Sequence, residues 1–171
     1  SERFFFRGIK FVMDGSTGGK TAAFSQPYLG EPDNYGELYN DPAILRGDML
    51  LSAKAGVQIS IHAIGDRAID WVVDTYDRAM RENPKKGLRH GIIHANIPSD
   101  RAIDVMARLQ REFDAGFPEP SATFTWWIGD TYAGNFGAAR SLRLNPFRTF
   151  RAKGMTWANG SDFGVTPFPA R

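Results

Sequence analysis

The sequence contains no cysteine, which excludes disulfide bonds and thiolate metal ligands within this chain. No apolar stretch approaches the roughly 20 residues that a membrane-spanning helix needs. No signal peptide is recognisable either. These absences predict a protein that has no membrane partner, and a cytoplasmic location is the default expectation.

The sequence also lacks a strong excess of either charge. Its 21 Lys and Arg residues nearly balance its 19 Asp and Glu residues, which gives a formal net charge of +2. That charge is too small, and the basic side chains are too scattered, to predict binding to nucleic acid. The chain shows no repeat and no linker, and its 171 residues are enough for one domain with a hydrophobic core.

The ends of the sequence do not read as the ends of a domain. The chain begins at Ser1 without methionine and stops at Arg171 within what reads as a loop. We therefore expect residues 1–171 to be a segment of one larger domain, truncated at both ends. By itself such a segment would leave sheet edges uncovered, so we expect it to form a homo-oligomer or to fold poorly.

What the sequence does contain is an alternation of short apolar runs and helical periodicity. The apolar runs predict strands at residues 9–13, 57–61, 89–94, 122–126 and 155–158. Periodicity and capping signals predict helices at residues 41–56, 66–80, 99–113 and 145–154. This order predicts an α/β fold of parallel strands with crossover helices, either an open doubly wound sheet or part of a (β/α)8 barrel.

Polar residues stand where three of these strands would end. His62 and His94 close two apolar runs, and Asp162 follows a third. Ligands bind at the carboxyl ends of parallel strands, so two imidazoles and a carboxylate there indicate a divalent-metal site. A single histidine would more often be a core residue, and Asp162 fits an Asx turn equally well. His90, four residues before His94, is better explained as a structural or supporting residue than as a ligand.

Lys10 stands inside the apolar run of residues 9–13, where a buried lysine is costly unless it is paired or modified. The structural interpretation is an edge strand whose Lys10 side chain is exposed to solvent. The functional one is an inward-facing lysine at the metal site, with carboxylation by carbon dioxide as one option. Asp14 has the same parity along the strand, so it would point toward the same cavity.

Residues 15–21 imitate a phosphate-binding loop, because they follow a strand and end in Gly-Lys-Thr. The motif requires glycine at position 14, where Asp14 would repel phosphate. A flavodoxin-like nucleotide binder that uses this loop therefore remains only an alternative. Asp66 is expected to be a helix N-cap or a residue that orients His62. Trp127, in the Trp126-Trp127 pair, is expected either to pack in the core or to line a pocket.

Several motifs occur together in a fixed order. They are Ile9-Lys10-Phe11 with Asp14-Gly15, His62-Ala63-Ile64-Gly65-Asp66-Arg67-Ala68, Arg89-His90-Gly91-Ile92-Ile93-His94-Ala95, Trp126-Trp127-x-Gly-Asp130 and Gly160-Ser161-Asp162-Phe163. With these motifs the chain resembles the amidohydrolase superfamily, specifically the family 3 branch that includes N-substituted formamide deformylases. The resemblance covers essentially the whole chain.

The resemblance implies strands four to eight of a (β/α)8 barrel, with Lys10, His62, His94 and Asp162 on strands four, five, six and eight. These four residues would bind a divalent metal, zinc being expected, and Asp162 would also be the general base. The implied activity is hydrolysis of amide or other non-peptide C–N bonds in small molecules. The family's strand-one His-x-His pair is absent, and Ile93 replaces the usual Glu. A non-catalytic binding protein of the same fold is therefore a competing hypothesis.

Overall fold

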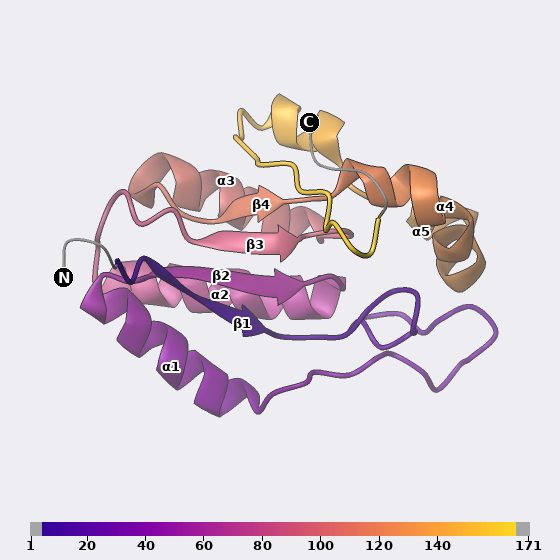
Figure 1. The fold of residues 1–171 in the computed structure, drawn as a ribbon, viewed down its shortest axis with the longest axis horizontal. Coiled ribbons are helices and arrows are strands. Elements are labelled where there is room, and N and C mark those ends of the chain that lie inside the picture. The colour runs from indigo at the N-terminus through magenta and orange to yellow at the C-terminus, as the bar shows by residue number, and fades with distance from the viewer. Residues whose placement is uncertain (1–4, 167–171) are drawn as a thin grey trace.

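The structure is a computed structural model that describes residues 5–166, and Figure 1 shows its α/β fold. The sheet in this part of the chain has four parallel strands in the order β1-β2-β3-β4. Their bounds are Gly8–Val12 for β1, Gln58–Ala63 for β2, Gly91–His94 for β3 and Phe117–Glu119 for β4. The parallel sheet with crossover helices confirms the predicted fold class. None of the described helices has the length and apolar character to cross a membrane.

Three helices connect the strands: α1 Pro42–Ala55, α2 Asp66–Glu82 and α3 Asp100–Phe113. In Figure 1, α2 and α3 pass behind the sheet and leave its near face without a helix. Ile59 and Ile61 of β2 are fully buried on the helix side, whereas the alternate residues are only half-buried. This alternation follows from the two-residue period of a strand.

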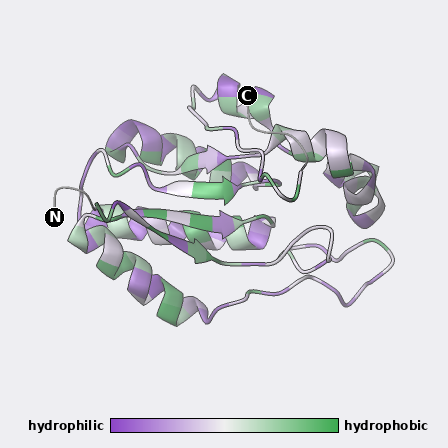
Figure 2. Cartoon of the chain, in the orientation of Figure 1, coloured by the Kyte–Doolittle hydropathy of each residue, from purple (hydrophilic) through white to green (hydrophobic). Residues whose placement is uncertain are grey.

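The near face, which we call the open face, carries Lys10, Ser60, His62, Ile93 and Glu119. Their common side follows from the parallel register, in which Lys10 pairs with Ser60 and His62 pairs with both Val12 and Ile93. Ile93 in turn pairs with Glu119. The sheet therefore separates an apolar helix side from a face that carries polar groups. Figure 2 shows hydrophilic and hydrophobic residues alternating along the helices, as expected for helices that bury one side.

The predicted start and stop signals of α1 are confirmed. The Asp41 side chain accepts a hydrogen bond from the Ala43 amide at 2.7 Å, and Pro42 occupies the first turn, where a missing N–H costs nothing. Gly56 ends the helix in the left-handed region with φ 78°. These local signals place α1 without help from tertiary contacts.

The prediction of a strand at residues 122–126 is wrong, because this segment begins helix α4, Ala122–Phe136. Apolar residues at helical spacing along α4 bury one face, including Phe124, Tyr132 and Phe136. They join a second cluster of buried side chains whose other members are Ala22, Phe24, Tyr28, Ile64 and Ile97. Tertiary packing thus overrides the strand-like composition of the segment. Two short helices follow, α5 Ala138–Ser141 and α6 Phe147–Ala152.

The prediction of a fifth strand at residues 155–158 is also not met in the described chain. Among the described residues, one backbone hydrogen bond joins this segment to β4, from the Ala158 N–H to the Pro118 carbonyl. A second follows just beyond both, from the Gly160 N–H to the Pro120 carbonyl. A parallel ladder needs reciprocal bonds from the β4 side, but proline has no N–H. Pro118 and Pro120 therefore leave the pairing one-sided, and they also concealed β4 itself from sequence analysis.

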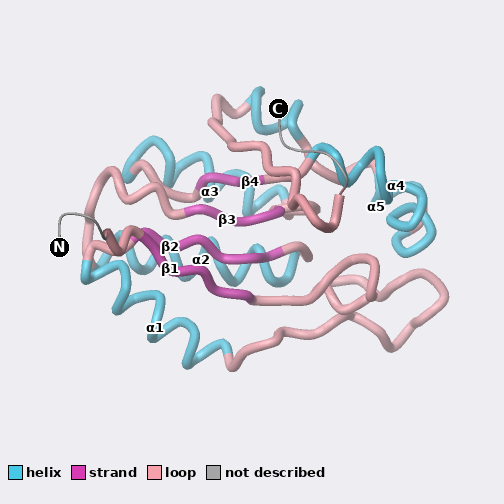
Figure 3. Tube along the Cα trace, in the orientation of Figure 1, coloured by secondary structure: helices cyan, strands magenta, loops and turns pink. Residues whose placement is uncertain are grey.

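The long loop between β1 and α1 extends past the carboxyl ends of the strands (Figure 3). Its residues Ala22, Phe24 and Tyr28 are buried against α4. Within residues 15–21 the polar groups bond to one another: the Gly19 amide donates to the Ser16 hydroxyl, and the Ser16 amide donates to the Thr21 hydroxyl. The loop therefore has a closed internal structure, and no helix begins at its end as a phosphate-binding loop requires.

Candidate metal centre

His62 and His94 come together at the carboxyl edge of the sheet. They lie at the ends of the neighbouring strands β2 and β3, and their ring centroids are 4.6 Å apart with the planes at 78°. Because parallel strands end at one edge, their last side chains are naturally adjacent. Two imidazoles at this separation can face one metal ion, since neutral imidazole is a common metal ligand.

The hydrogen bond of His62 assigns its tautomer. Its Nε2 lies 2.9 Å from the carbonyl oxygen of Gly15, which can only accept a hydrogen bond. We therefore assign the proton to Nε2, which also lies 3.5 Å from a carboxylate oxygen of Asp14. Nδ1 then has a free lone pair. Metal-binding histidines characteristically use one ring nitrogen for the metal and donate the other N–H to an oxygen.

His94 has an unsatisfied nitrogen in a buried position. Its side chain is 6% exposed, and Nδ1 has no hydrogen-bond partner among residues 5–166. Burial lowers the pKa of His94 to about 3, and electrostatic interactions with His62 and Lys10 lower it further. The ring is therefore neutral near pH 7. Since an unsatisfied buried acceptor is less rare than an unsatisfied N–H donor, we assign a bare lone pair to Nδ1.

Asp14 lies beside His62, just beyond the end of strand β1. Strand β1 ends at Val12, so the strand alternation no longer applies at Asp14. The Asp14 carboxylate is fully buried and accepts hydrogen bonds from the amides of Ala23, Ile64 and Gly65 at 2.9–3.0 Å. Burial raises its pKa, and these three bonds oppose that rise. Asp14 therefore ties the long loop to the end of β2 beside His62.

Lys10 lies exposed on the open face, on the same side of the sheet as His62. Its positive charge opposes the rise in the pKa of Glu119 that burial causes, and it lowers the pKa of His94. These electrostatic effects place Lys10 in the neighbourhood of both groups. Sequence analysis missed Glu119, because the flanking prolines concealed its strand.

Gly91 leaves the space that Glu119 occupies. A Cβ atom on Gly91 would lie 1.9 Å from Glu119 Oε1, so the carboxylate rests directly on the backbone of β3. Gly91 pairs with Ser60 of β2. A glycine inside a predicted strand was therefore the sequence signal that another side chain lies across β3.

A cavity of about 240 Å³ opens beside His94 at this edge of the sheet. Its walls come from β3, β4 and the segment after α6, and the lining residues are Ile93, His94, Glu119, Ser121, Ala158, Asn159, Gly160 and Asp162. Asp162 is exposed and adopts φ 50°. Its carbonyl oxygen accepts hydrogen bonds from the amides of Val165 and Thr166, and the residue is part of the lining of this cavity.

His90 does not line this cavity. It is fully buried on the helix side of the sheet, where its ring stacks on Tyr76 of α2 with centroids 5.3 Å apart. Its Nδ1 accepts a hydrogen bond from the Ile59 amide at 3.0 Å. Strict strand alternation would put His90 and His94, four residues apart, on one face of the sheet. His94 departs from this alternation because it has φ 73°.

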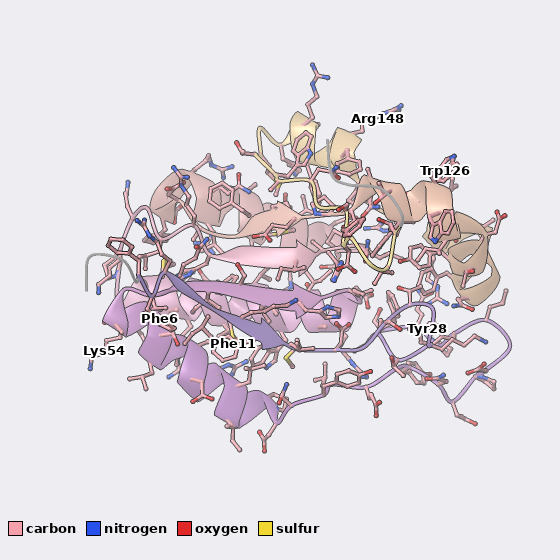
Figure 4. All side chains as sticks on the ribbon, viewed as in Figure 1. Phe6, Phe11, Tyr28, Lys54, Trp126 and Arg148 are labelled. Carbon is pink, nitrogen blue, oxygen red and sulfur yellow. The ribbon has the colours of Figure 1, made fainter. Side chains whose placement is uncertain are left out.

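Asp66 and Trp127 also lie away from the histidine pair. The N-cap of α2 is Gly65, and Asp66 instead accepts hydrogen bonds from the amide and hydroxyl of Ser25 in the long loop. Trp127 stacks on Trp126 with centroids 6.0 Å apart on α4. Figure 4 shows Trp126 projecting outward from that helix. Neither Asp66 nor Trp127 is among the residues that line the cavity beside His94.

The donor set fits part of a metal site. His62 and His94 supply two adjacent imidazoles, and Asp162 and Glu119 line the adjoining cavity. Across residues 5–166, however, no three His, Asp or Glu side chains lie close enough to hold a metal ion. The described chain therefore contributes some of the ligands that a complete site requires.

Comparison with protein families finds one match over nearly the entire chain. The model of the amidohydrolase family, designated Amidohydro_3, matches residues 1–170. The YtcJ protein of Bacillus subtilis (strain 168) is 29% identical over 163 residues, which are 95% of this chain and 29% of YtcJ. The protein LONG AFTER FAR-RED 3 of Arabidopsis thaliana is 38% identical over 95 residues, 56% of this chain and 16% of that protein.

Solved structures show the same fold. A metal-dependent hydrolase from Pyrococcus furiosus superposes with a TM-score of 0.79 at 24% identity. The match covers 98% of this chain and 33% of the Pyrococcus furiosus chain. A second metal-dependent hydrolase, from Pyrococcus horikoshii OT3, gives a TM-score of 0.72 at 24% identity. The match covers 92% of this chain and 30% of the Pyrococcus horikoshii chain. The chain thus spans about a third or less of the length of the relatives it matches.

Proposed function

The chain belongs to the amidohydrolase family, and we propose that it supplies part of the active site of a metal-dependent hydrolase. The substrate class we propose is small molecules with amide or other non-peptide C–N bonds, N-formyl and N-acyl amines above all. One observation supports this proposal most strongly. A chain of this family contains two imidazoles whose ring centroids are 4.6 Å apart. One ring donates its Nε2–H to a backbone carbonyl, and the other has a buried nitrogen without a hydrogen-bond partner in the described residues.

In this proposal His62 and His94 hold a divalent metal through their Nδ1 atoms. Imidazole and carboxylate donors suit zinc. Such an ion, when bound, polarises the substrate carbonyl and makes a bound water more acidic. Gly15 and Asp14 keep the His62 ring oriented, because the Nε2–H has a fixed acceptor.

The general base in this proposal is Asp162. Its carboxylate takes a proton from the attacking water and later gives it to the leaving nitrogen, so that the amine departs neutral. Its location on the rim of the cavity beside His94 supports this role. Lys10, on the open face, would be a further metal ligand after its neutral amine adds carbon dioxide, which gives a carbamate and releases a proton.

We further propose that residues 1–171 are a segment of one barrel domain. The open face then lies toward the barrel interior, and further strands of the same domain cover it. This explains why polar groups and the half-exposed Val12 lie on a sheet face without helices. The segment alone should self-associate or be inactive, because an uncovered sheet face and edge persist.

The test uses the full-length protein after metal removal and reconstitution with zinc. We expect zinc-dependent hydrolysis of N-formyl or N-acyl amines in the wild type. His62→Ala and His94→Ala should each lower activity about a thousandfold or more, since metal activation supplies several kcal/mol to the transition state. His90→Gln is the control, because that ring lies on the helix side of the sheet and should leave zinc content unchanged.

The outcomes separate the two hypotheses. Zinc binding that His94→Ala abolishes, without hydrolysis of any amide, would favour a non-catalytic binding protein of the same fold. Zinc content that survives both His62→Ala and His94→Ala would remove the histidine pair from the site. Mass spectrometry of native protein at high carbonate would show whether Lys10 carries a carboxyl group.

A further inference from the structure

The backbone immediately after β3 adopts a conformation that its residues disfavour. His94 has φ 73° and Ala95 has φ 43°, so two consecutive non-glycine residues lie in the left-handed region. Side chains with a Cβ atom rarely adopt this conformation, and it persists only when surrounding contacts enforce it. Something near His94 must therefore hold this turn in place.

The first support comes from a pair of buried asparagines. The side-chain amide of Asn96 donates to Asn145 Oδ1 at 2.9 Å, and the Asn145 backbone amide donates to the Asn96 carbonyl at 2.8 Å. Both side chains are buried, at 0% and 5% exposure. Asn96 Oδ1 has no partner among residues 5–166, so the Asn96 amide group depends on Asn145 alone. Asn145 therefore fixes the chain two residues after His94.

The second support reaches the His94 ring from the other side. Asn145 Nδ2 donates to the Ser121 carbonyl at 3.2 Å and to the Thr125 hydroxyl at 3.0 Å. These two residues flank Phe124 at the start of α4. The Phe124 ring stacks on the His94 imidazole, with centroids 5.7 Å apart and planes at 17°. The same amide thus fixes the helix turn whose aromatic ring covers His94.

We infer that Asn145 is a positioning residue for His94, joining the strained turn behind the imidazole to the aromatic ring stacked on it. Among the described residues Asn145 does not line the cavity, and its hydrogen bonds go to Asn96, Ser121 and Thr125 rather than to the histidine ring. It therefore acts through Asn96 and through the first turn of α4. Its role as a support for a metal ligand rests on the proposed function. Its role in fixing the His94 ring does not.

The conformation of Asn145 itself suggests the variant to make. Asn145 has φ 47°, which glycine adopts freely, so Asn145→Gly removes the side-chain bonds without adding backbone strain. Asn145→Asp keeps the acceptor for Asn96 but loses the donor to the Ser121 carbonyl, while the Thr125 hydroxyl can donate to the new carboxylate. The matched control is Asp114→Gly, another left-handed residue with φ 56°, which caps α3 at the opposite edge of the sheet. Thr125→Val removes one bond from an exposed side chain and serves if Asn145→Gly does not fold.

Two measurements on the full-length protein test the inference. The first is the ¹⁵N and ¹H NMR spectrum of the His94 ring in metal-free protein, assigned with His94→Gln. We expect Asn145→Gly to shift or broaden the His94 signals, Asn145→Asp and Thr125→Val to do so less, and Asp114→Gly to leave them unchanged. The second is titration with Co²⁺, whose absorption spectrum reports ligand geometry; Asn145→Gly should raise the dissociation constant about tenfold and alter the spectrum.

Unchanged His94 signals in both Asn145→Gly and Thr125→Val would overturn the inference, as would an equal shift in Asp114→Gly. Failure of the proposed function has a different signature. In that case the wild type does not bind Co²⁺, while the His94 signals still respond to Asn145→Gly. An intact His94 signal with unimpaired Co²⁺ binding in Asn145→Gly would instead leave the proposed function standing and reject the positioning role.

Discussion

His90 and His94 lie four residues apart at the two ends of β3, and both are buried with lowered pKa values, to about 4 and about 3. Burial alone lowers the pKa of His90, whose ring stacks under α2. The pKa of His94 is lowered also by electrostatic interactions with His62 and Lys10. Burial therefore does not distinguish a structural histidine from a site histidine, whereas neighbouring titratable groups do.

The backbone supports the same distinction. His90 immediately precedes a regular strand, and its Nδ1 accepts a bond from the adjacent strand. His94 ends that strand in the left-handed region. The position of the polar group on the helix side thus follows from the regular pairing of the strands. The positions of the polar groups at the carboxyl edge depend instead on specific contacts made by loops. Substitutions at Asp14, His90, His94 and Asp162 test this comparison through the free energy of unfolding.

The largest effect is expected at Asp14, which organises the carboxyl edge. Asp14→Ala would leave the three buried amides of Ala23, Ile64 and Gly65 without an acceptor. Each unsatisfied buried donor costs about 1–3 kcal/mol, so we expect a loss of at least about 3 kcal/mol. Urea unfolding followed by circular dichroism measures it, with the midpoint falling and the slope unchanged.

The milder Asp14→Asn is the matched variant. One of its two terminal atoms becomes an NH₂ group, which faces an N–H donor in either orientation. We expect a loss of about 1–3 kcal/mol, from at least one broken buried bond. A change below about 0.5 kcal/mol in both variants would show that the three amides find water, and that the carboxyl edge is not held by Asp14.

The sequence predicted the helix side of the molecule well, because α1, α2 and α3 follow from apolar periodicity and caps such as Asp41 and Ser99. It also predicted that His62 and His94 lie at adjacent strand ends. What it did not contain was the location of β4. Pro118 and Pro120 make that strand resemble a loop, so Glu119 was missed as well.

The loop structure of the site was not predictable either. Strand parity suggested that Asp14 faces the same side as Lys10, but parity holds only while the strand continues. The left-handed turn at His94 and Ala95 has no sequence signal, since neither residue is glycine or asparagine. Its support, Asn145, lies far along the chain, and only the tertiary structure connects the two.

The next effect is a pH dependence that arises on the helix side. The pKa of His90 is about 4 in the folded state and about 6.5 in the unfolded state. Between these values the unfolded chain binds the proton more tightly, so this stability is complete above pH 6.5 and is lost as the pH falls toward 4. The difference corresponds to about 3 kcal/mol at most.

His90→Gln should therefore flatten the profile of unfolding free energy against pH in metal-free protein, measured by urea titrations between pH 7.5 and about 4.5. His94→Gln should flatten it in the same direction, because the pKa of His94 is lowered too. Profiles for wild type and His90→Gln that run parallel would mean that His90 is accessible to protons in the folded state, and the comparison of the two histidines would lose its basis.

The smallest effect on stability is expected at Asp162. Asp162→Asn makes the same chemical change as Asp14→Asn, and asparagine tolerates φ 50°. The Asp162 side chain is exposed, and its turn is held by its carbonyl oxygen, which the substitution retains. We expect the free energy of unfolding to change by less than about 0.5 kcal/mol. Zinc-dependent hydrolysis should nevertheless fall about 10²–10⁴-fold, because an amide cannot accept the proton of the attacking water. The opposite pattern, a destabilised protein with full activity, would place Asp162 among the structural carboxylates with Asp14 and would require another base for the reaction.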